Sequence, residues 1–166
     1  MSGVEQLLKA LADNQAKFIV VGAYAAIMQG STLRTDDLDV CYERTPDNYK
    51  KIIRAIALFR PRLRGVPENL KAPFDEQALA QGTNFTLTTD LGNLDLLGEL
   101  SGVGGYRQII TDVRLVNLGS IICQVASLET IIRSKEAADR PKDHATLPEL
   151  KALRMIQKRE QEGPDR

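Results

Sequence analysis

The sequence predicts an α/β fold with a mixed β-sheet and C-terminal helices. Two observations support this class. In the first half, apolar stretches with strand character alternate with segments of helical period. In the second half, pairs of short strand-like runs flank tight turns, which is typical of antiparallel hairpins. Alternation favours parallel pairing and hairpins are antiparallel, so the two halves together predict a mixed sheet.

The first half is expected to alternate helix and strand. Its elements should be a helix carrying Val4, Leu7, Leu8 and Leu11, a strand at 17–21, a helix at 23–29, a strand at 37–42 and a helix at 45–59. The first strand ends in continuous apolar residues, as expected for a strand that is covered on both faces. Gly30 suits the end of the second helix, and Thr45-Pro46 suits the beginning of the third.

The second half is expected to hold hairpins followed by helices. Its elements should be a loop at 60–73, a short helix at 75–81, a hairpin of strands 85–88 and 94–97, a flexible stretch at 101–105, a hairpin of strands 114–118 and 121–125, and a helix at 127–138. Thr146-x-x-Glu149 has the capping-box pattern and predicts the start of a last helix. We expect a single domain over residues 1–160 and a frayed tail at 161–166.

Composition is that of a globular protein with no preferred partner. The chain of 166 residues is 43% hydrophobic, and 22 basic residues balance 22 acidic ones. Cys41 and Cys123 lack disulfide or metal-ligand patterning and are expected to be small buried hydrophobes. No apolar run is long enough to span a bilayer, and the N-terminus lacks a signal-peptide pattern. We therefore expect a cytoplasmic protein without a membrane partner.

Two aspartates in the second predicted strand are the clearest candidates for chemistry. In Asp37-Leu38-Asp39-Val40, strand alternation places both carboxylates on one face and both apolar side chains on the other. Adjacent carboxylates repel each other unless a cation lies between them. The pattern therefore indicates a Mg²⁺ site that also takes ligands from substrate phosphates.

These residues also carry a family resemblance. Gly22-Ala23, followed after thirteen residues by residues 37–40, resembles the signature of the DNA polymerase β-like nucleotidyltransferase superfamily. The resemblance is greatest to small bacterial nucleotidyltransferases related to AbiEii-type toxins. Leu94-Asp95-Leu96-Leu97 resembles the strand with the third family carboxylate, and residues 127–143 resemble the distal helix with its basic-acidic turn. Ala23 departs from the Gly or Ser that the family usually has.

The resemblance implies a Mg²⁺-dependent nucleotidyltransferase. Such an enzyme moves an NMP from an NTP to an acceptor hydroxyl and releases pyrophosphate, with two Mg²⁺ ions. Asp37 and Asp39 would bind both ions, and Asp95 would complete the ion nearest the nucleophile and help to deprotonate it. The acceptor would be an RNA such as tRNA, or a protein, and a toxin of this kind would have a cognate antitoxin as partner.

Further residues are candidates for nucleotide binding. They are Gly22, Ala23, Gly30, Ser31, Arg34, Lys135, Lys142 and Asp143. Backbone N–H groups and the hydroxyl at Gly30-Ser31 suit a phosphate, although this pair can equally be a helix stop. The resemblance implies that Lys135 meets the triphosphate, but a lysine near an apolar helix face can also extend to solvent. Asp143 can touch nucleotide or acceptor, or act as a helix cap.

Two other functions stay open at this point. The first is a nucleotide-binding or partner-binding module without turnover, suggested by Ala23 and the short chain. The second is a small-molecule transferase of the aminoglycoside type. That activity usually needs an acidic acceptor pocket in an extra domain, and the sequence offers no obvious segment for one.

Overall fold

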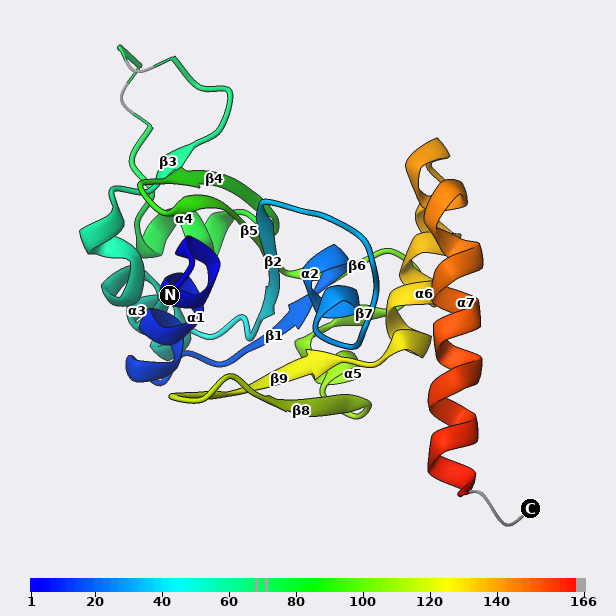
Figure 1. Cartoon of the computed structure of the whole chain (residues 1–166). Coiled ribbons are helices and arrows are strands. Elements are labelled where there is room, and N and C mark those ends of the chain that lie inside the picture. The colour runs from blue at the N-terminus through cyan, green and yellow to red at the C-terminus, as the bar shows by residue number, and fades with distance from the viewer. Residues whose placement is uncertain (68, 71, 164–166) are drawn as a thin grey trace.

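A seven-stranded sheet runs through the middle of the protein in the computed structural model, which describes residues 1–67, 69–70 and 72–163 (Figure 1). The strand order is β3-β4-β5-β2-β1-β9-β8. The strands are β1 (Phe18–Val21), β2 (Asp37–Tyr42), β3 (Arg62–Leu63), β4 (Phe85–Thr89), β5 (Gly92–Leu97), β8 (Val113–Asn117) and β9 (Ile122–Ala126). A separate two-stranded sheet is formed by β6 (Glu99–Leu100) and β7 (Gly104–Gly105).

The large sheet is mixed, as the sequence predicts. β2 runs parallel to β5, and β1 runs parallel to β9. The β1–β2, β3–β4, β4–β5 and β8–β9 pairs are antiparallel. β2 and β1 lie at its centre, and their apolar residues Ile19, Val20, Leu38 and Val40 are fully buried. The prediction of an α/β fold with a mixed sheet and C-terminal helices is therefore confirmed.

Helices cover both faces of this sheet. They are α1 (Gly3–Asp13), α2 (Gly22–Ile27), α3 (Pro46–Ile56), α4 (Glu76–Gln81), α5 (Tyr106–Ile109), α6 (Leu128–Ala138) and α7 (Pro141–Glu162), with a 3₁₀ turn at Ala57–Phe59. Figure 1 shows α1 and α3 on one side and α6 and α7 on the other. The apolar stripe of α1, including Leu7, Leu8 and Leu11, is buried in the core. No helix within the described ranges is both long and apolar enough to cross a bilayer.

The last helix begins earlier than the sequence predicts. α7 starts at Pro141, so the expected start at Thr146 is wrong. Pro141 occupies the first helical position, and the Asp143 carboxylate accepts a hydrogen bond from the Arg140 backbone N–H at 3.2 Å. Residues 141–143 therefore cap the helix, and α7 continues through Pro148. Glu162 is its last residue, so the first part of the expected frayed tail is helical, and residues 164–166 lie outside the described residues.

Two expected loops contain short regular segments. β3 adds an edge strand within the predicted loop at 60–73 by pairing with β4. The predicted flexible stretch at 101–105 lies in the β6–β7 hairpin, and α5 follows it directly. These strands have only two residues each, so their pairing depends on the partner strand and leaves no periodic pattern in the sequence.

Candidate active site

Two aspartates from distant parts of the chain lie side by side on the face of the sheet that α6 and α7 cover. In the parallel pairing of β2 with β5, Asp39 is opposite Asp95, and Asp37 is opposite Asn93. Leu38 and Leu94 are also opposite each other and are fully buried on the other face. The alternation that the sequence predicts for residues 37–40 therefore continues across both strands.

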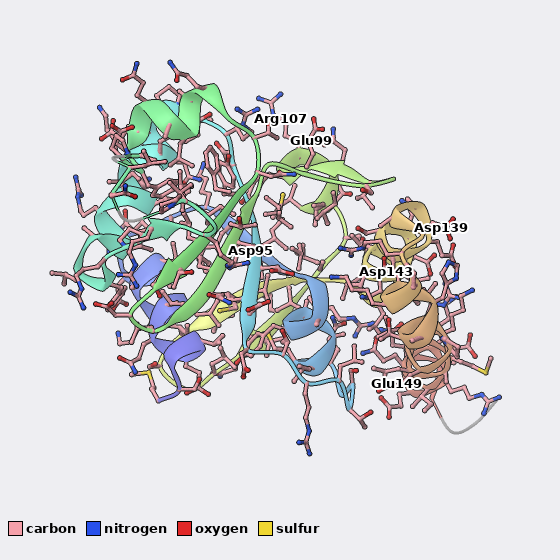
Figure 2. All side chains as sticks on the ribbon, turned by 90° about the horizontal axis from the view of Figure 1, so that it is seen from above. Asp95, Glu99, Arg107, Asp139, Asp143 and Glu149 are labelled. Carbon is pink, nitrogen blue, oxygen red and sulfur yellow. The ribbon has the colours of Figure 1, made fainter. Side chains whose placement is uncertain are left out.

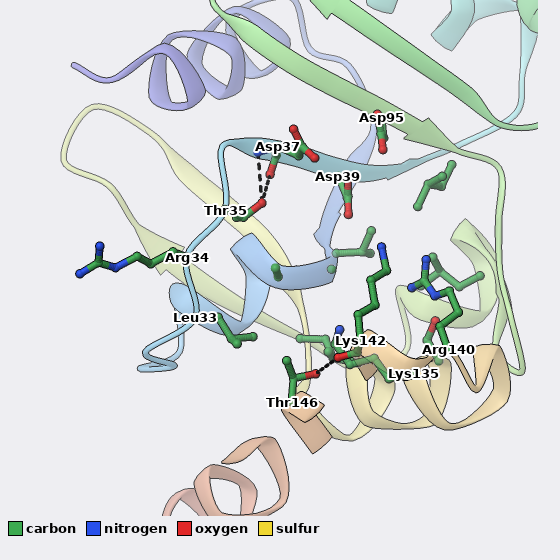
Figure 3. Close-up of a pocket in the computed structure, with 17 residues that line it drawn as sticks. Leu33, Arg34, Thr35, Asp37, Asp39, Asp95, Lys135, Arg140, Lys142 and Thr146 are labelled. Carbon is green, nitrogen blue, oxygen red and sulfur yellow. Dashed lines mark hydrogen bonds between the residues drawn. The ribbon is translucent and has the colours of Figure 1, made fainter. Parts of the chain in front are cut away.

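The aspartates form one wall of a cavity of about 430 Å³ (Figure 3). It is lined by Val21, Gly22, Ala23, Leu33, Arg34, Thr35, Asp37, Asp39, Asp95, Leu97, Leu100, Ile131, Ser134, Lys135, Arg140, Lys142 and Thr146. The cations come mainly from α6 and from the start of α7, opposite the sheet. One wall is therefore acidic and the facing wall is basic, which suits a ligand that brings both metal ions and phosphates.

The carboxyl group of Asp39 has a strongly perturbed pKa. Burial raises this pKa to about 7, and the negative charges of Asp95 and Asp37 add to the rise. The charge of Lys142 acts in the opposite direction, and Figure 3 shows this side chain extending from α7 into the cavity. Asp39 Oδ1 is buried and has no hydrogen-bond partner among the residues that the structure describes. A carboxylate in this position would be stabilised by a cation.

Gly22 makes room for Asp39. This residue joins β1 to α2 with φ of +68°, a left-handed conformation that favours glycine. A Cβ atom at this position would overlap Asp39 Oδ2. Gly22 is thus needed both for the sharp strand-to-helix turn and for the close approach of the Asp39 carboxylate. Ala23 follows it at the start of α2 and also lines the cavity.

The other two aspartates already have partners. Asn93 Nδ2 donates to Asp37 Oδ1 at 2.9 Å, and Arg64 Nη2 donates to Asp95 Oδ1 at 2.9 Å. In this arrangement, no group of three or more Asp, Glu, His or Cys side chains among the described residues is placed to hold a metal ion.

The donor chemistry nevertheless fits Mg²⁺. Every candidate ligand on the acidic wall is a carboxylate oxygen, the kind of ligand that Mg²⁺ prefers. One buried oxygen, Asp39 Oδ1, has no competing partner. Asp39 is thus the residue best prepared to bind a cation, whereas Asp37 and Asp95 would have to exchange their present partners.

A buried aspartate holds the basic wall in place. The Asp143 side chain is completely buried and lies 3.3 Å from Lys135 Nζ and 2.7 Å from Arg140 Nε. Burial would by itself raise the pKa of Asp143, but hydrogen bonds from Arg140 and Lys135 outweigh it and leave this pKa below its ordinary value. Asp143 is not among the residues that line the cavity, and Figure 2 shows it on the pair of helices near the C-terminus.

The structure does not bring every candidate residue to the cavity. Gly30 and Ser31 lie outside its lining, and Ser31 Oγ donates to Glu149 Oε1 at 3.1 Å. The same carboxylate oxygen accepts from the Thr32 backbone N–H at 2.7 Å, so this segment is attached to α7. Arg34 lines the cavity, but Figure 3 shows its guanidinium directed away from the three aspartates.

Several residues of the site were not singled out from the sequence. Thr35 Oγ1 accepts from the Asp37 backbone N–H at 3.1 Å and orders the start of β2, and its place just before the aspartates could have suggested this role. Arg140 lies in the same turn as Lys142 and Asp143, which the sequence did single out. Nothing local identifies Arg64 or Asn93, because each reaches its aspartate only through strand pairing.

Strand order, helix cover and paired aspartates together define a mixed α/β fold with a candidate active site on one face of the sheet. A scan against protein-family models and a search of curated protein sequences both found no match. Solved structures do match. TM1012 from Thermotoga maritima, a proposed nucleotidyltransferase, superposes with a TM-score of 0.55 at 15% identity over 92% of this chain and 91% of its own. Lincosamide antibiotic adenylyltransferase LnuA, bound to lincomycin, superposes with a TM-score of 0.59 at 14% identity over 91% of this chain and 96% of its own. At these identities the likeness shows the fold.

Proposed function

We propose that this protein is a Mg²⁺-dependent nucleotidyltransferase that moves an NMP from an NTP to an acceptor hydroxyl and releases pyrophosphate. One observation carries the proposal: Asp39, with a buried oxygen that lacks a partner, lies beside Asp95 on one wall of a cavity whose facing wall is cationic. Substrates with both a metal ion and a triphosphate match these two walls.

Residues on the two walls of the cavity would have different roles. Asp37, Asp39 and Asp95 would hold two Mg²⁺ ions, which when bound supply Lewis-acid stabilisation of the attacking and leaving oxygens. Lys135, Arg140 and Lys142 bind the triphosphate from the opposite side.

Other groups prepare the reacting atoms. Asp95 accepts the proton of the acceptor hydroxyl as that oxygen attacks the α-phosphorus. Leu97, Leu100 and Ile131 belong to the apolar part of the lining and exclude water that would compete with the acceptor. Gly22 leaves the space that Asp39 requires.

The acceptor we favour is an RNA such as tRNA, or a protein, in the cytoplasm, with a cognate antitoxin as the controlling partner. This choice rests on the resemblance of residues 22–23, 37–40 and 127–143 to the AbiEii-related nucleotidyltransferases. The basic residues that line the cavity are compatible with a polyanionic acceptor.

A second candidate is transfer to a hydroxyl of a small molecule. The specific observation in its favour is the match to LnuA, which covers 96% of that chain. The matched enzyme has hardly any chain beyond the shared fold, so a small-molecule adenylyltransferase does not require an extra domain. The expected need for an extra domain therefore no longer counts against a small-molecule acceptor.

The test uses each of the four α-labelled NTPs with Mg²⁺ and the full-length protein. Parallel reactions offer total bacterial RNA, a protein extract, lincomycin or an aminoglycoside as acceptor. Label in RNA or protein supports the favoured acceptor, and label on an antibiotic supports the second candidate. NTP binding without label in any reaction would overturn catalysis and leave the non-catalytic binding module.

Asp39→Asn and Asp36→Asn form a matched pair for this assay. Asp36 is exposed and outside the cavity, whereas Asp39 is half-buried within it. We expect transfer to fall by at least about a hundredfold in Asp39→Asn, as for the loss of a group that binds the transition state, and to persist in Asp36→Asn. Equal activity of both folded variants would contradict the assignment.

A further inference from the structure

An arginine forms an ion pair with Asp95, the aspartate that the proposed chemistry needs as a metal ligand. Arg64 Nη2 lies 2.9 Å from Asp95 Oδ1 and donates at 2.8 Å to the backbone carbonyl of Leu87. The Arg64 backbone N–H also donates to the Thr86 carbonyl at 2.9 Å. The side chain is therefore fixed to β4, next to the strand that carries Asp95.

This contact joins two residues that line different cavities. Asp95 lines the cavity with the aspartates, whereas Arg64 lines a second cavity of about 610 Å³ together with residues such as Pro67 and Phe74. The Arg64 side chain is 34% exposed and that of Asp95 is 19% exposed, so the ion pair is partly open to solvent. A partly exposed pair of this kind is weak enough to be exchanged for another partner.

The Arg64 guanidinium places a positive charge beside Asp95, where a bound metal ion would also place one. Asp95 lies opposite Asp39 in the β2–β5 pairing, so an unbalanced negative charge on Asp95 is unfavourable for both aspartates. A guanidinium on Asp95 offsets that charge. It would also repel a divalent cation that approaches the same oxygen.

We propose that Arg64 holds Asp95 in place of a divalent cation and that a cation binds Asp95 only after the guanidinium has released it. This inference rests on the proposed function, because it takes Asp95 for a metal ligand. Because Nη2 donates to both Asp95 and the Leu87 carbonyl, release of Asp95 requires this end of the guanidinium to move, whereas the backbone hydrogen bond to Thr86 keeps Arg64 on β4.

The test measures Mn²⁺ affinity of the full-length protein without nucleotide, by calorimetry or by the signal of free Mn²⁺ in electron paramagnetic resonance. Arg64→Gln is expected to bind Mn²⁺ roughly threefold more tightly or better, the size expected once a partly exposed ion pair no longer opposes binding. Arg62→Gln is the matched control, since Arg62 contacts Asp90 at 3.5 Å. It removes the same charge two residues away and should change affinity much less.

A double-mutant cycle shows whether the effect passes through Asp95. In an Asp95→Asn background, Arg64→Gln should no longer tighten Mn²⁺ binding. Thermal unfolding checks the fold of each variant. If Arg64→Gln does not fold, Arg64→Lys is used instead. A smaller gain in Mn²⁺ affinity is then expected, because lysine keeps the positive charge but not the paired contacts with Asp95 and the Leu87 carbonyl.

Unchanged or weaker Mn²⁺ binding in Arg64→Gln would overturn the inference, as would absence of Mn²⁺ binding in all variants. The label-transfer assay separates this result from the proposed function. Transfer by the unmutated protein without tighter binding in Arg64→Gln removes only the role of Arg64. Tighter binding without any transfer leaves the exchange in place and removes the catalytic proposal.

Discussion

At the scale of single residues, Asp39 makes the protein less stable at neutral pH. Its pKa rises from 3.8 to about 7 on folding, so the folded state holds a proton that the unfolded state has released between these values. Stability therefore falls as the pH rises through this window, and the penalty is complete above it. Without metal, Asp39→Asn should be more stable than the unmutated protein at pH 8, by about 1–3 kcal/mol.

The measurement is the melting temperature at pH 8 and at pH 4 in the presence of a chelator. The gain should be several degrees at pH 8 and should shrink toward pH 4, where the carboxyl is protonated in the folded state. Asp36→Asn, on the exposed neighbour, should show little change at either pH. A gain that is the same at both values would show that the ionisation of Asp39 is not its cause.

Gly22 offers a second prediction at this scale. Gly22→Ala should lower stability by about 2–4 kcal/mol and reduce activity, because it adds left-handed strain and overlaps Asp39. Gly119→Ala is its control, since Gly119 has φ of +88° but nothing within 4 Å of an added Cβ. Urea unfolding of both variants measures the difference. Equal losses would mean that backbone strain, and not the space for Asp39, explains the glycine.

At the scale of elements, the junction of α6 and α7 depends on Asp143. Asp143→Asn should cost about 2–4 kcal/mol at pH 7, because it leaves Lys135 without a compensating charge in a buried setting. The pKa of Asp143 is lowered, so its contribution is present above the ordinary carboxyl pKa and is lost as the pH falls through the lowered value.

Asp139→Asn is the matched control for this junction, because the Asp139 side chain is 72% exposed. Chemical unfolding at pH 7 and near pH 3 tests the prediction. Similar effects of the two substitutions, or a cost for Asp143→Asn that persists in acid, would contradict it.

Strong local patterns at this scale were predictable from the sequence. The alternation in 37–40 predicted both the strand and the face of its aspartates, and the structure confirms them. The start of α7 was not predictable, because two capping patterns, at Arg140 and at Thr146, lie six residues apart. The earlier one is used, and there the buried contact of Asp143 with Lys135 on α6 adds a tertiary interaction. Contacts such as Arg64 with Asp95 span 31 residues and leave no local signal.

At the scale of the whole molecule, Glu149 connects the segment before β2 to α7. Its carboxylate accepts hydrogen bonds from Ser31 and Thr32, and the Thr32 bonds lower its pKa. Glu149→Ala should therefore speed hydrogen exchange at the Thr32 amide, whereas Glu160→Ala near the end of the same helix should not. Exchange measured by NMR or mass spectrometry decides this. Unchanged protection of Thr32 in a folded Glu149→Ala protein would contradict the connection.

The pairing of β2 with β5 has a consequence for synthesis of the chain. Asp39 meets Asp95 only through strand register, and the basic wall comes from residues 135–142 near the opposite end of the sequence. A growing chain on the ribosome therefore has no assembled cavity until residues 135–146 have emerged. A product that stops before α7 retains its aspartates but lacks Lys142 and the Asp143 carboxylate that holds Lys135 and Arg140 in place. Under the proposed function, fragments that end before α7 would therefore lack transfer activity although they carry all three aspartates.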